Sequence, residues 1–219
     1  SNGWLEFRRV LFRSFFYYLG SVNIVVSKSD DNKHELILKE YKNMNYETVR
    51  LNRRWVIFGK KSNPLIESSK YKTIDKATYK IDWVSGDTAV VTYKTSSSSA
   101  LKQSIFSFRS TNYISYQNVA PSLAGKWLEK DNPNNYFIYN LGKIVYTKDS
   151  KIYYYSDQDT QQQGVTSIII KGDETKPSLT LVLNSTCVIG NNCLIEGGGT
   201  ITISPVTLQK SKGNVYYKK

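Results

Sequence analysis

The sequence predicts an all-β protein built from two antiparallel modules, the C-terminal one a small up-and-down barrel or sandwich. In most segments, apolar residues recur at every second position, which is the period of a half-buried strand. Seventeen tyrosines stand against one methionine and one histidine, a composition typical of strand-forming chains. Two-residue turn sequences separate consecutive apolar segments at hairpin spacing. No segment after Gly20 has the periodicity of a helix of three turns.

The first module begins with a β-branched segment, Val22-Asn-Ile-Val-Val26, which predicts a strand. Leu36 and Leu38 share one face of the next predicted strand. Two further strands, over residues 79–83 and 88–93, flank Ser85-Gly86 and form a predicted hairpin. Alternation of this kind indicates one buried face and one wet face in each strand.

The second module continues the same pattern. Leu141-Gly142 and Asp149-Ser150 are short turns that join three consecutive strands into a predicted meander. Longer polar segments, residues 157–164 among them, are expected to be loops. The strands expected in this module lie at residues 136–139, 144–147, 151–155, 178–183 and 200–203.

The likeliest module boundary by composition is Asn118-Val-Ala-Pro121, which divides the chain into residues 22–118 and 122–219. Residues 15–26 are apolar, but this stretch has only twelve residues, whereas a membrane-spanning helix needs about 20. We interpret residues 15–21 as the remnant of an N-terminal anchor, followed by the first strand.

Residues 1–14 are interpreted as an artefact. The run from Leu5 to Ser14 resembles the in-frame translation of a common sequencing adapter, and its three arginines would otherwise imitate a signal sequence or a basic helix.

The formal net charge is +12, which favours anionic partners. One basic cluster alternates with Trp55 and Phe58 and is the predicted contact for an anionic membrane or cell-wall polymer, with a solvated strand end as the alternative. Nucleic acid is an unlikely partner, because the lysines are scattered and no helix presents them to a groove. The cluster comprises Arg50, Arg53, Arg54, Lys60 and Lys61.

Two cysteines, Cys187 and Cys193, are separated by five residues. In an oxidising compartment they are expected to form a disulfide that closes a small loop, and the alternative is two unrelated thiols. Their spacing is not that of a zinc site, so the sequence predicts neither a metal nor a cofactor.

The sequence carries no catalytic motif, and we predict that the protein is not an enzyme. The single histidine, His34, lies in a charged strand entry, and no Gly-x-Ser-x-Gly nucleophile turn is present. Paired carboxylates that could serve a hydrolase fall in polar turns, where aspartate is an ordinary turn former. These pairs are Asp30-Asp31, Asp157/Asp159 and Asp173-Glu174.

The segment Leu123-Ala-Gly125-Lys-Trp127 resembles the first-strand Gly-x-Trp motif of lipocalin-type barrels. The resemblance implies that Trp127 plugs the closed end of a barrel, that Gly125 lets the backbone bend beneath it, and that a small apolar ligand binds in the mouth. The arginine usual on the last strand of that family is missing, and Lys218 and Lys219 are the nearest candidates. Another antiparallel barrel or a sandwich remains the alternative.

The N-terminal module, with Ser29-Asp-Asp-Asn-Lys33 and later Trp83-Val-Ser-Gly-Asp-Thr88, is similar to uncharacterised membrane-anchored or secreted β-proteins of Gram-positive bacteria. This resemblance implies an extracytoplasmic location, either anchored to the cell membrane or secreted. We therefore expect a non-catalytic binding or interaction role in the envelope. The alternatives are a purely structural surface protein and, less favoured, a carboxylate-dependent hydrolase.

Deleting residues 1–14 is expected to leave the melting temperature unchanged, because this segment offers no period-two partner for any predicted strand. Thermal unfolding of the full and shortened chains measures the effect. A drop of several degrees would show that the segment packs on the fold and is not an artefact.

Overall fold

The chain is all-β in the computed structural model, which describes residues 20–42, 48–53, 59–66, 71–109 and 118–219. Contacts divide it into two compact units, the first containing residues 1–79 and 93–102 and the second residues 80–92 and 103–219. The strands between residues 80 and 107 therefore belong mostly with the C-terminal unit, whereas the sequence places them in the module of residues 22–118. The predicted artefact and most of the predicted anchor remnant lie outside the described residues.

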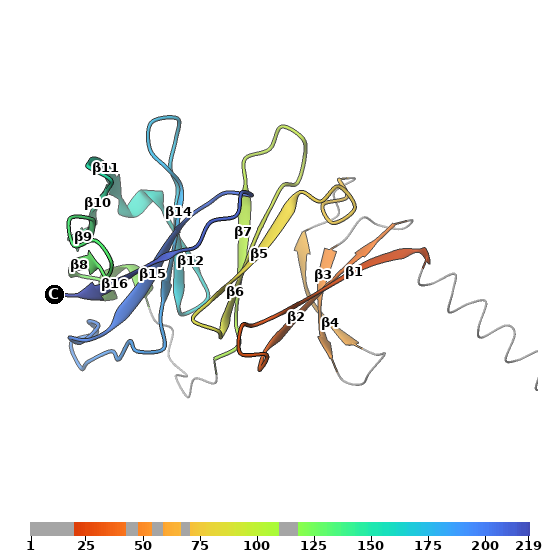
Figure 1. Cartoon of the computed structure of the whole chain (residues 1–219), viewed down its shortest axis with the longest axis horizontal. Coiled ribbons are helices and arrows are strands. Elements are labelled where there is room, and N and C mark those ends of the chain that lie inside the picture. The colour runs from red at the N-terminus through yellow and green to blue at the C-terminus, as the bar shows by residue number, and fades with distance from the viewer. Residues whose placement is uncertain (1–19, 43–47, 54–58, 67–70, 110–117) are drawn as a thin grey trace, which may run out of the picture. The chain divides into compact units, whose positions relative to one another are not determined.

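The first unit contains an antiparallel sheet with the strand order β1-β2-β3-β4 (Figure 1). Leu36 and Leu38 of β2 are buried as predicted, but Ile37, Lys39 and Glu40 are buried as well, so the expected wet face is missing from the middle of this strand. Its strands are β1 (Val22–Lys28), β2 (Glu35–Tyr41), β3 (Thr48–Arg53) and β4 (Gly59–Ile66).

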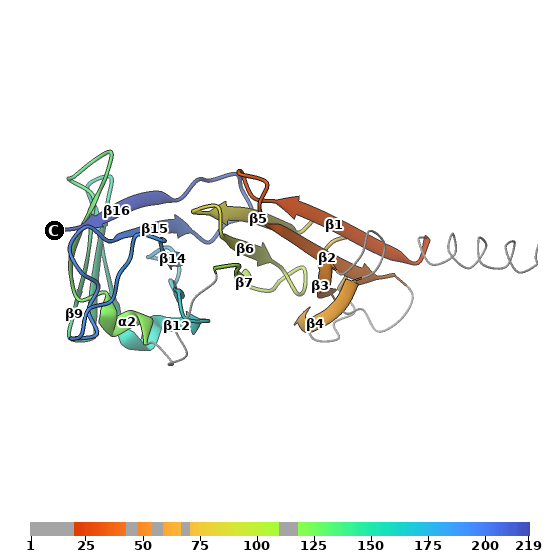
Figure 2. The same cartoon turned by 90° about the horizontal axis from the view of Figure 1, so that it is seen from below.

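The second unit contains a nine-stranded antiparallel sheet that curls into a nearly closed barrel (Figure 2). Neighbouring strands are consecutive in the chain, and β16 pairs back with β8, so that the last strand closes on the first. The two remaining edges, β11 and β12, are joined by the short 3₁₀ helix η1 (Asp157–Asp159). The strands are β8 (Gly125–Glu129), β9 (Tyr136–Asn140), β10 (Lys143–Lys148), β11 (Lys151–Ser156), β12 (Thr160–Gln163), β13 (Ser167–Ile170), β14 (Leu179–Leu183), β15 (Thr200–Pro205) and β16 (Asn214–Lys218).

The predicted hairpin turns fix the register of these strands. Leu141 and Gly142 have φ values of 46° and 79°, and Asp149 and Ser150 have φ values of 50° and 66°. Positive φ at both turn residues gives the twist that matches antiparallel strands. The meander β9-β10-β11 follows directly and confirms the sequence prediction. The segment 157–164, expected to be a loop, instead contains β12, whose polar Thr160–Gln163 sequence has no apolar period.

The interior of the barrel is packed with side chains. The short helix α2 (Val119–Ser122) precedes β8 and contributes Val119 and Ala120 to the core. Trp127 is fully buried, and its indole Nε1 donates a hydrogen bond to the Leu123 carbonyl oxygen over 2.8 Å. The other buried residues of this hydrophobic core include Phe137, Tyr139, Ile144, Tyr146, Tyr155, Ile168, Ile170, Leu179, Leu181, Leu183, Ile195, Ile201, Ile203 and Tyr216.

A three-stranded sheet covers part of the outside of the barrel. It consists of β5 (Tyr79–Val84), β6 (Thr88–Tyr93) and β7 (Lys102–Ser107). Val84 and Val90 pack on Val182 of β14, which points away from the barrel interior. Every residue of β6 and β14 is buried. The expectation of one wet face is therefore wrong for these strands, because each is covered on both sides.

A buried carboxylate ties the closing strands together. Glu129 of β8 is only 5% exposed and lies inside the barrel. It accepts hydrogen bonds from the Lys148 amine of β10 at 2.9 Å, the Asn135 amide at 2.7 Å, the Tyr216 hydroxyl at 3.3 Å and the Asn214 amide. Burial alone raises the pKa of Glu129, but the hydrogen bonds and the charge of Lys148 outweigh it, so that the pKa falls below its ordinary value.

Trp127→Ala is expected to destabilise the second unit by roughly 3–5 kcal/mol, because it removes a fully buried ring and leaves a cavity. Chemical denaturation measures the loss. The matched control is Tyr154→Ala, since this ring is 67% exposed and its removal is expected to change stability by less than about 0.5 kcal/mol. Equal stability of the two variants would contradict the role of Trp127 in the core.

Glu129 is expected to make the second unit acid-sensitive. Because its pKa is lower in the folded than in the unfolded chain, its stabilisation is complete above the unfolded value near 4.5 and is lost as the pH falls through the folded value. Glu129→Gln is expected to cost about 1–3 kcal/mol at neutral pH and to flatten the acid limb of the stability–pH curve. The exposed Asp131→Asn serves as the control. An unchanged acid limb in Glu129→Gln would contradict this assignment.

Candidate binding surface

The outer side of strands β16, β8, β9, β10 and β11 carries a continuous row of mostly apolar side chains. Alternation along each strand places these residues opposite the buried core positions. The strand register places each of these residues directly opposite the next one on the neighbouring strand. The row runs through Tyr217, Leu128, Tyr136, Thr147 and Ile152.

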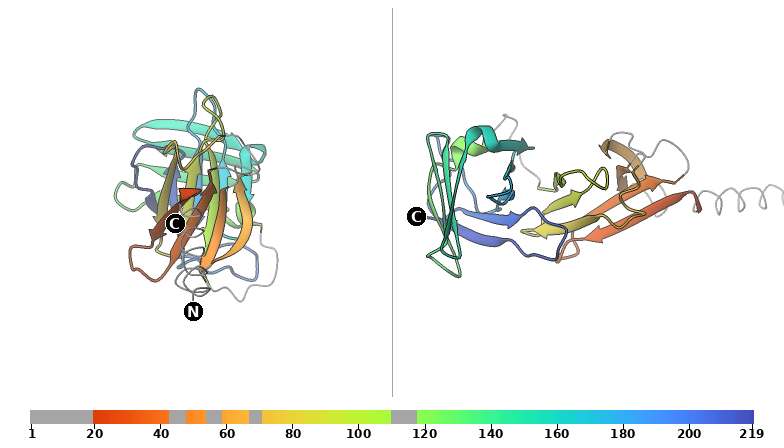
Figure 3. Two further views of the ribbon diagram at one scale, coloured as in Figure 1. Left: turned by 90° about the vertical axis from the view of Figure 1, so that its right-hand side faces the viewer. Right: turned by 90° about the horizontal axis from the view of Figure 1, so that it is seen from above.

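A second row lies beside the first and is joined by the same register. It consists of Lys126, Ile138, Val145 and Tyr154. The Lys126 amine stands 4.6 Å from the centroid of the Tyr136 ring, so the two rows are in contact. We call these nine residues the meander face. In the right-hand view of Figure 3, the green meander strands stand together at one end of the second unit.

The meander face is open, in contrast to the outer side of β14. Tyr154 is 67% exposed, Ile152 50% and Tyr217 37%, whereas Val182 and Thr180 on the outside of β14 are buried. Within the second unit, no described strand or helix is found over the meander face as the β5–β7 sheet is over β14. Contiguous exposed apolar area of this kind marks an interaction surface.

Thr147, in the centre of the first row, has an unusual environment. It is 6% exposed, and its hydroxyl has no hydrogen-bond partner among the described residues. Leaving such a group unsatisfied costs roughly 1–3 kcal/mol. The hydroxyl oxygen itself is inaccessible, so a molecule bound to the meander face would not reach it without a rearrangement.

The charge around the meander face is positive. The outward positions of its five strands hold no aspartate or glutamate. Acidic residues lie in the turns, as Asp131 and Asp149 do, and at the β11 edge, where Asp173 shares a groove with Ile152 and Tyr154. Four exposed lysines surround or join the apolar rows on the outward side of these strands or directly after them: Lys126, Lys130, Lys143 and Lys219.

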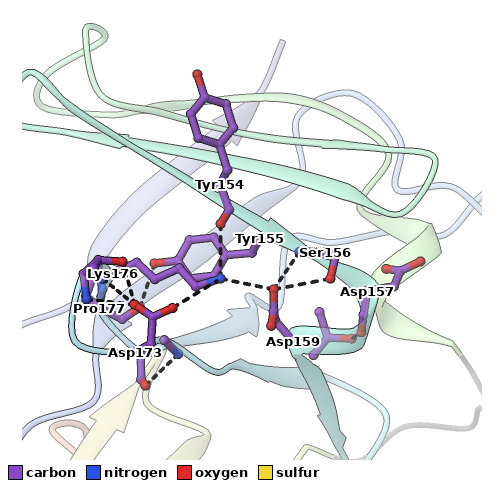
Figure 4. A network of polar contacts seen from close by, with 12 residues as sticks. Tyr154, Tyr155, Ser156, Asp157, Asp159, Asp173, Lys176 and Pro177 are labelled. Atoms are coloured by element: carbon purple, nitrogen blue, oxygen red, sulfur yellow. Dashed lines mark hydrogen bonds and ion pairs between the residues drawn. The ribbon is translucent and has the colours of Figure 1, made fainter.

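A polar network borders the meander face at the edge strand β11 (Figure 4). The Lys176 amine, from the loop between β13 and β14, lies 3.4 Å from an Asp159 carboxylate oxygen and 3.9 Å from one of Asp173. It also donates to the Tyr154 carbonyl oxygen over 3.3 Å and stands 4.8 Å from the centroid of the Tyr155 ring. Figure 4 shows the Tyr154 ring pointing away from this network.

The carboxylates of this network both favour the ionised form. The pKa of Asp159 is lowered, first by the Ser156 backbone N–H, and that of Asp173 is lowered, first by the Thr175 hydroxyl. A general acid in glycoside hydrolysis needs a raised pKa. Both carboxylates are instead held ionised by turn contacts and Lys176, which is a structural arrangement.

The predicted plug residues lie at the closing strands of the barrel. Gly125 has a φ of 122°, and a Cβ there would stand 3.3 Å from the Lys218 side chain. The Lys218 amine lies 5.8 Å from the centroid of the Trp127 ring and donates to the Ile195 carbonyl oxygen. Burial lowers the pKa of Lys218. A lysine of the last strand therefore stands over the tryptophan, where the lipocalin resemblance implies an arginine.

The predicted disulfide is not formed, and both cysteines are free thiols. The bridge between Ile189 and Ile195 makes a small hairpin with Cys193 at its tip. Cys187 precedes the base of this hairpin, and its thiol donates to the Thr200 carbonyl oxygen over 3.0 Å. The turn-forming residues between the cysteines thus belong to a small hairpin that includes Cys193.

The predicted basic cluster is described only in part. Arg50 and Arg53 lie on β3, and Lys60 and Lys61 lie on the adjacent β4, so the fold brings their backbones together. Arg54 and the side chains of the other four lie outside what the structure describes. This contact stays a prediction.

Within the described part of the chain, no helix has the length and hydropathy needed to cross a bilayer. The same residues contain no cluster of histidine, cysteine and carboxylate side chains suited to a metal ion. Comparisons with protein-family models, curated proteins and solved structures find no match.

Sequence reasoning missed the meander face as a unit. The runs Tyr153-Tyr-Tyr155 and Tyr216-Tyr217 are visible in the sequence, and alternation separates their inward from their outward tyrosines. Which outward faces stay uncovered depends on where the β5–β7 sheet packs, and periodicity carries no information about that.

Proposed function

We propose that this protein is a non-catalytic binding protein that attaches to an anionic membrane surface through the meander face. The observation that carries the proposal is the coincidence of two open apolar rows with surrounding lysines and no outward carboxylate on the same strands. Tyrosine and aliphatic side chains suit the boundary between lipid headgroups and acyl chains, and lysines add attraction to anionic headgroups.

The packing of the barrel supports an external site over an internal one. A small apolar ligand in a lipocalin-like mouth is the use that the Gly-x-Trp resemblance implies. The described interior is occupied by large side chains, among them Trp127, Phe137 and Tyr216. The lipocalin relation and the extracytoplasmic location remain parts of this proposal.

The test is cosedimentation with vesicles of phosphatidylglycerol and of phosphatidylcholine across a salt series. We expect binding to the anionic vesicles only, weakening as salt shortens the Debye length to about 8 Å at physiological ionic strength. The double variant Lys126→Glu/Lys143→Glu is expected to bind at least about 30-fold more weakly, since each surface lysine contributes about 1 kcal/mol.

The matched control is Lys102→Glu/Lys210→Glu, which changes the net charge equally at two exposed lysines. Lys102 begins β7, and Lys210 lies between Gln209 and Ser211, which both accept from Lys80 of β5. Equal weakening by both double variants would mean that total charge, and not this face, governs binding. Binding to purified anionic wall polymer but not to vesicles would reject the membrane and assign the face to the polymer.

A further inference from the structure

The edge strand β11 has backbone groups that no described residue pairs. In the β10–β11 hairpin, the residues flanking the two-residue turn, Lys148 and Lys151, form a hydrogen-bonded pair, and such pairs recur at every second position. Ile152, Tyr154 and Ser156 therefore direct their N–H and C=O groups away from β10. Two contacts agree with this: the Tyr154 carbonyl accepts from Lys176, and the Ser156 N–H donates to Asp159.

The edge is protected only at its C-terminal end. Asp159 satisfies the Ser156 N–H at 2.9 Å, and Lys176 occupies one of the two acceptor positions of the Tyr154 carbonyl. Within the described chain, the Tyr154 N–H and both backbone groups of Ile152 have no partner. An open edge of this kind is a template for another strand.

A groove runs beside this open edge. Its volume is about 430 Å³, and its second wall is the loop between β13 and β14. That wall is kept in shape by Asp173, whose carboxylate accepts from the backbone N–H groups of Thr175 and Lys176 at 2.8 and 3.1 Å. The volume lies within the range of about 300–1,000 Å³ typical of ligand sites. The lining residues are Ile152, Tyr153, Tyr154, Asp173, Thr175 and Lys176.

We propose that this groove binds an extended acidic segment of a partner protein, which adds a strand to β11. Strand addition takes its affinity from main-chain hydrogen bonds and its specificity from alternate side chains. The incoming residues opposite Ile152 and Tyr154 would stand beside these two exposed side chains, as in the aromatic and β-branched pairs that stabilise sheets.

Charge favours an acidic partner over a second copy of this chain. The chain has a net charge of +12, so pairing two copies would bring like charges together. Lys151 is exposed at the start of β11, next to the open edge. Lys176 is shared by Asp173 and Asp159, so the attraction for an acidic segment comes from Lys151 and from the net charge of the chain. This site differs from the proposed membrane contact because it binds through backbone groups, whereas the membrane contact uses the outward side chains of the meander face.

The experiment measures fluorescence anisotropy of a labelled heptapeptide of alternating valine and threonine with glutamate at both ends. The full chain is expected to bind it, and the same peptide N-methylated at its central residues is expected to bind at least about ten-fold more weakly, since methylation removes the strand-pairing donors.

Ile152→Pro gives the matching change in the protein. It removes an N–H from the open edge without removing a rung from the β10–β11 ladder. We expect about a ten-fold loss of peptide binding, whereas the control Ile152→Thr, which keeps the N–H, should lose much less. Both variants remove the same apolar side chain from the meander face, so vesicle binding should fall equally in the two.

Equal binding of the parent and N-methylated peptides, or no binding of either to the full chain, would overturn the proposal. The peptide comparison uses the unaltered protein and so decides the matter even if Ile152→Pro unfolds. Vesicle binding without peptide binding would leave the proposed function standing and reject strand addition alone. If the chain self-associated without peptide, and if Ile152→Pro abolished that self-association, the edge would belong to a second copy of the chain. The acidic segment would then be rejected.

Discussion

The pairing of β8 with β16 makes the C-terminal unit a barrel, and the buried charge of Glu129 depends on it. A buried carboxylate is costly unless it is paired and hydrogen-bonded. Its donors come from the loop before β9, from β10 and from β16, so all of these elements must be in place together. At the same seam Lys218 stands over Trp127. The first and last strands are thus joined by backbone pairing, by charge and by a buried ring.

Closure of the barrel decides where binding can take place. Inward positions are occupied by the core and by the Glu129 network, which leaves the outer surface. On the β14 side that surface is covered by the β5–β7 sheet, and the bidentate pair of Arg109 with Asp87, extended to the Leu183 carbonyl, fixes this cover. The meander side has no such cover among the described residues of the second unit, so its apolar rows face outward. The packing of the β5–β7 sheet on one side of the barrel therefore explains both the burial of β14 on its two sides and the exposure of the meander face.

The sequence predicted what depends on neighbouring residues and missed what depends on distant ones. Hairpins at Leu141-Gly142 and Asp149-Ser150 could be foreseen because the turn residues and the flanking alternation are local. The polar strand β12 could not, since it pairs with β13 without an apolar period of its own. The donors of Glu129 lie up to 87 residues away in the chain, so no sequence motif predicts the network. The hairpin closed by Ile189 and Ile195, which includes Cys193, likewise could not be foreseen from the cysteine spacing.

Strand β11 combines an open face and an open edge, and both follow from its position as the last strand before the barrel's gap. A strand inside the sheet has neighbours on both sides, whereas β11 is paired only with β10. Natural edges are commonly protected by lysines and by covering loops. Here the β13–β14 loop supplies both, because Lys176 reaches the Tyr154 carbonyl from it. The protection stops short of Ile152, and the net positive charge of the chain opposes pairing with another copy. This combination of an open edge with a net positive charge is the basis on which we propose a partner of opposite charge.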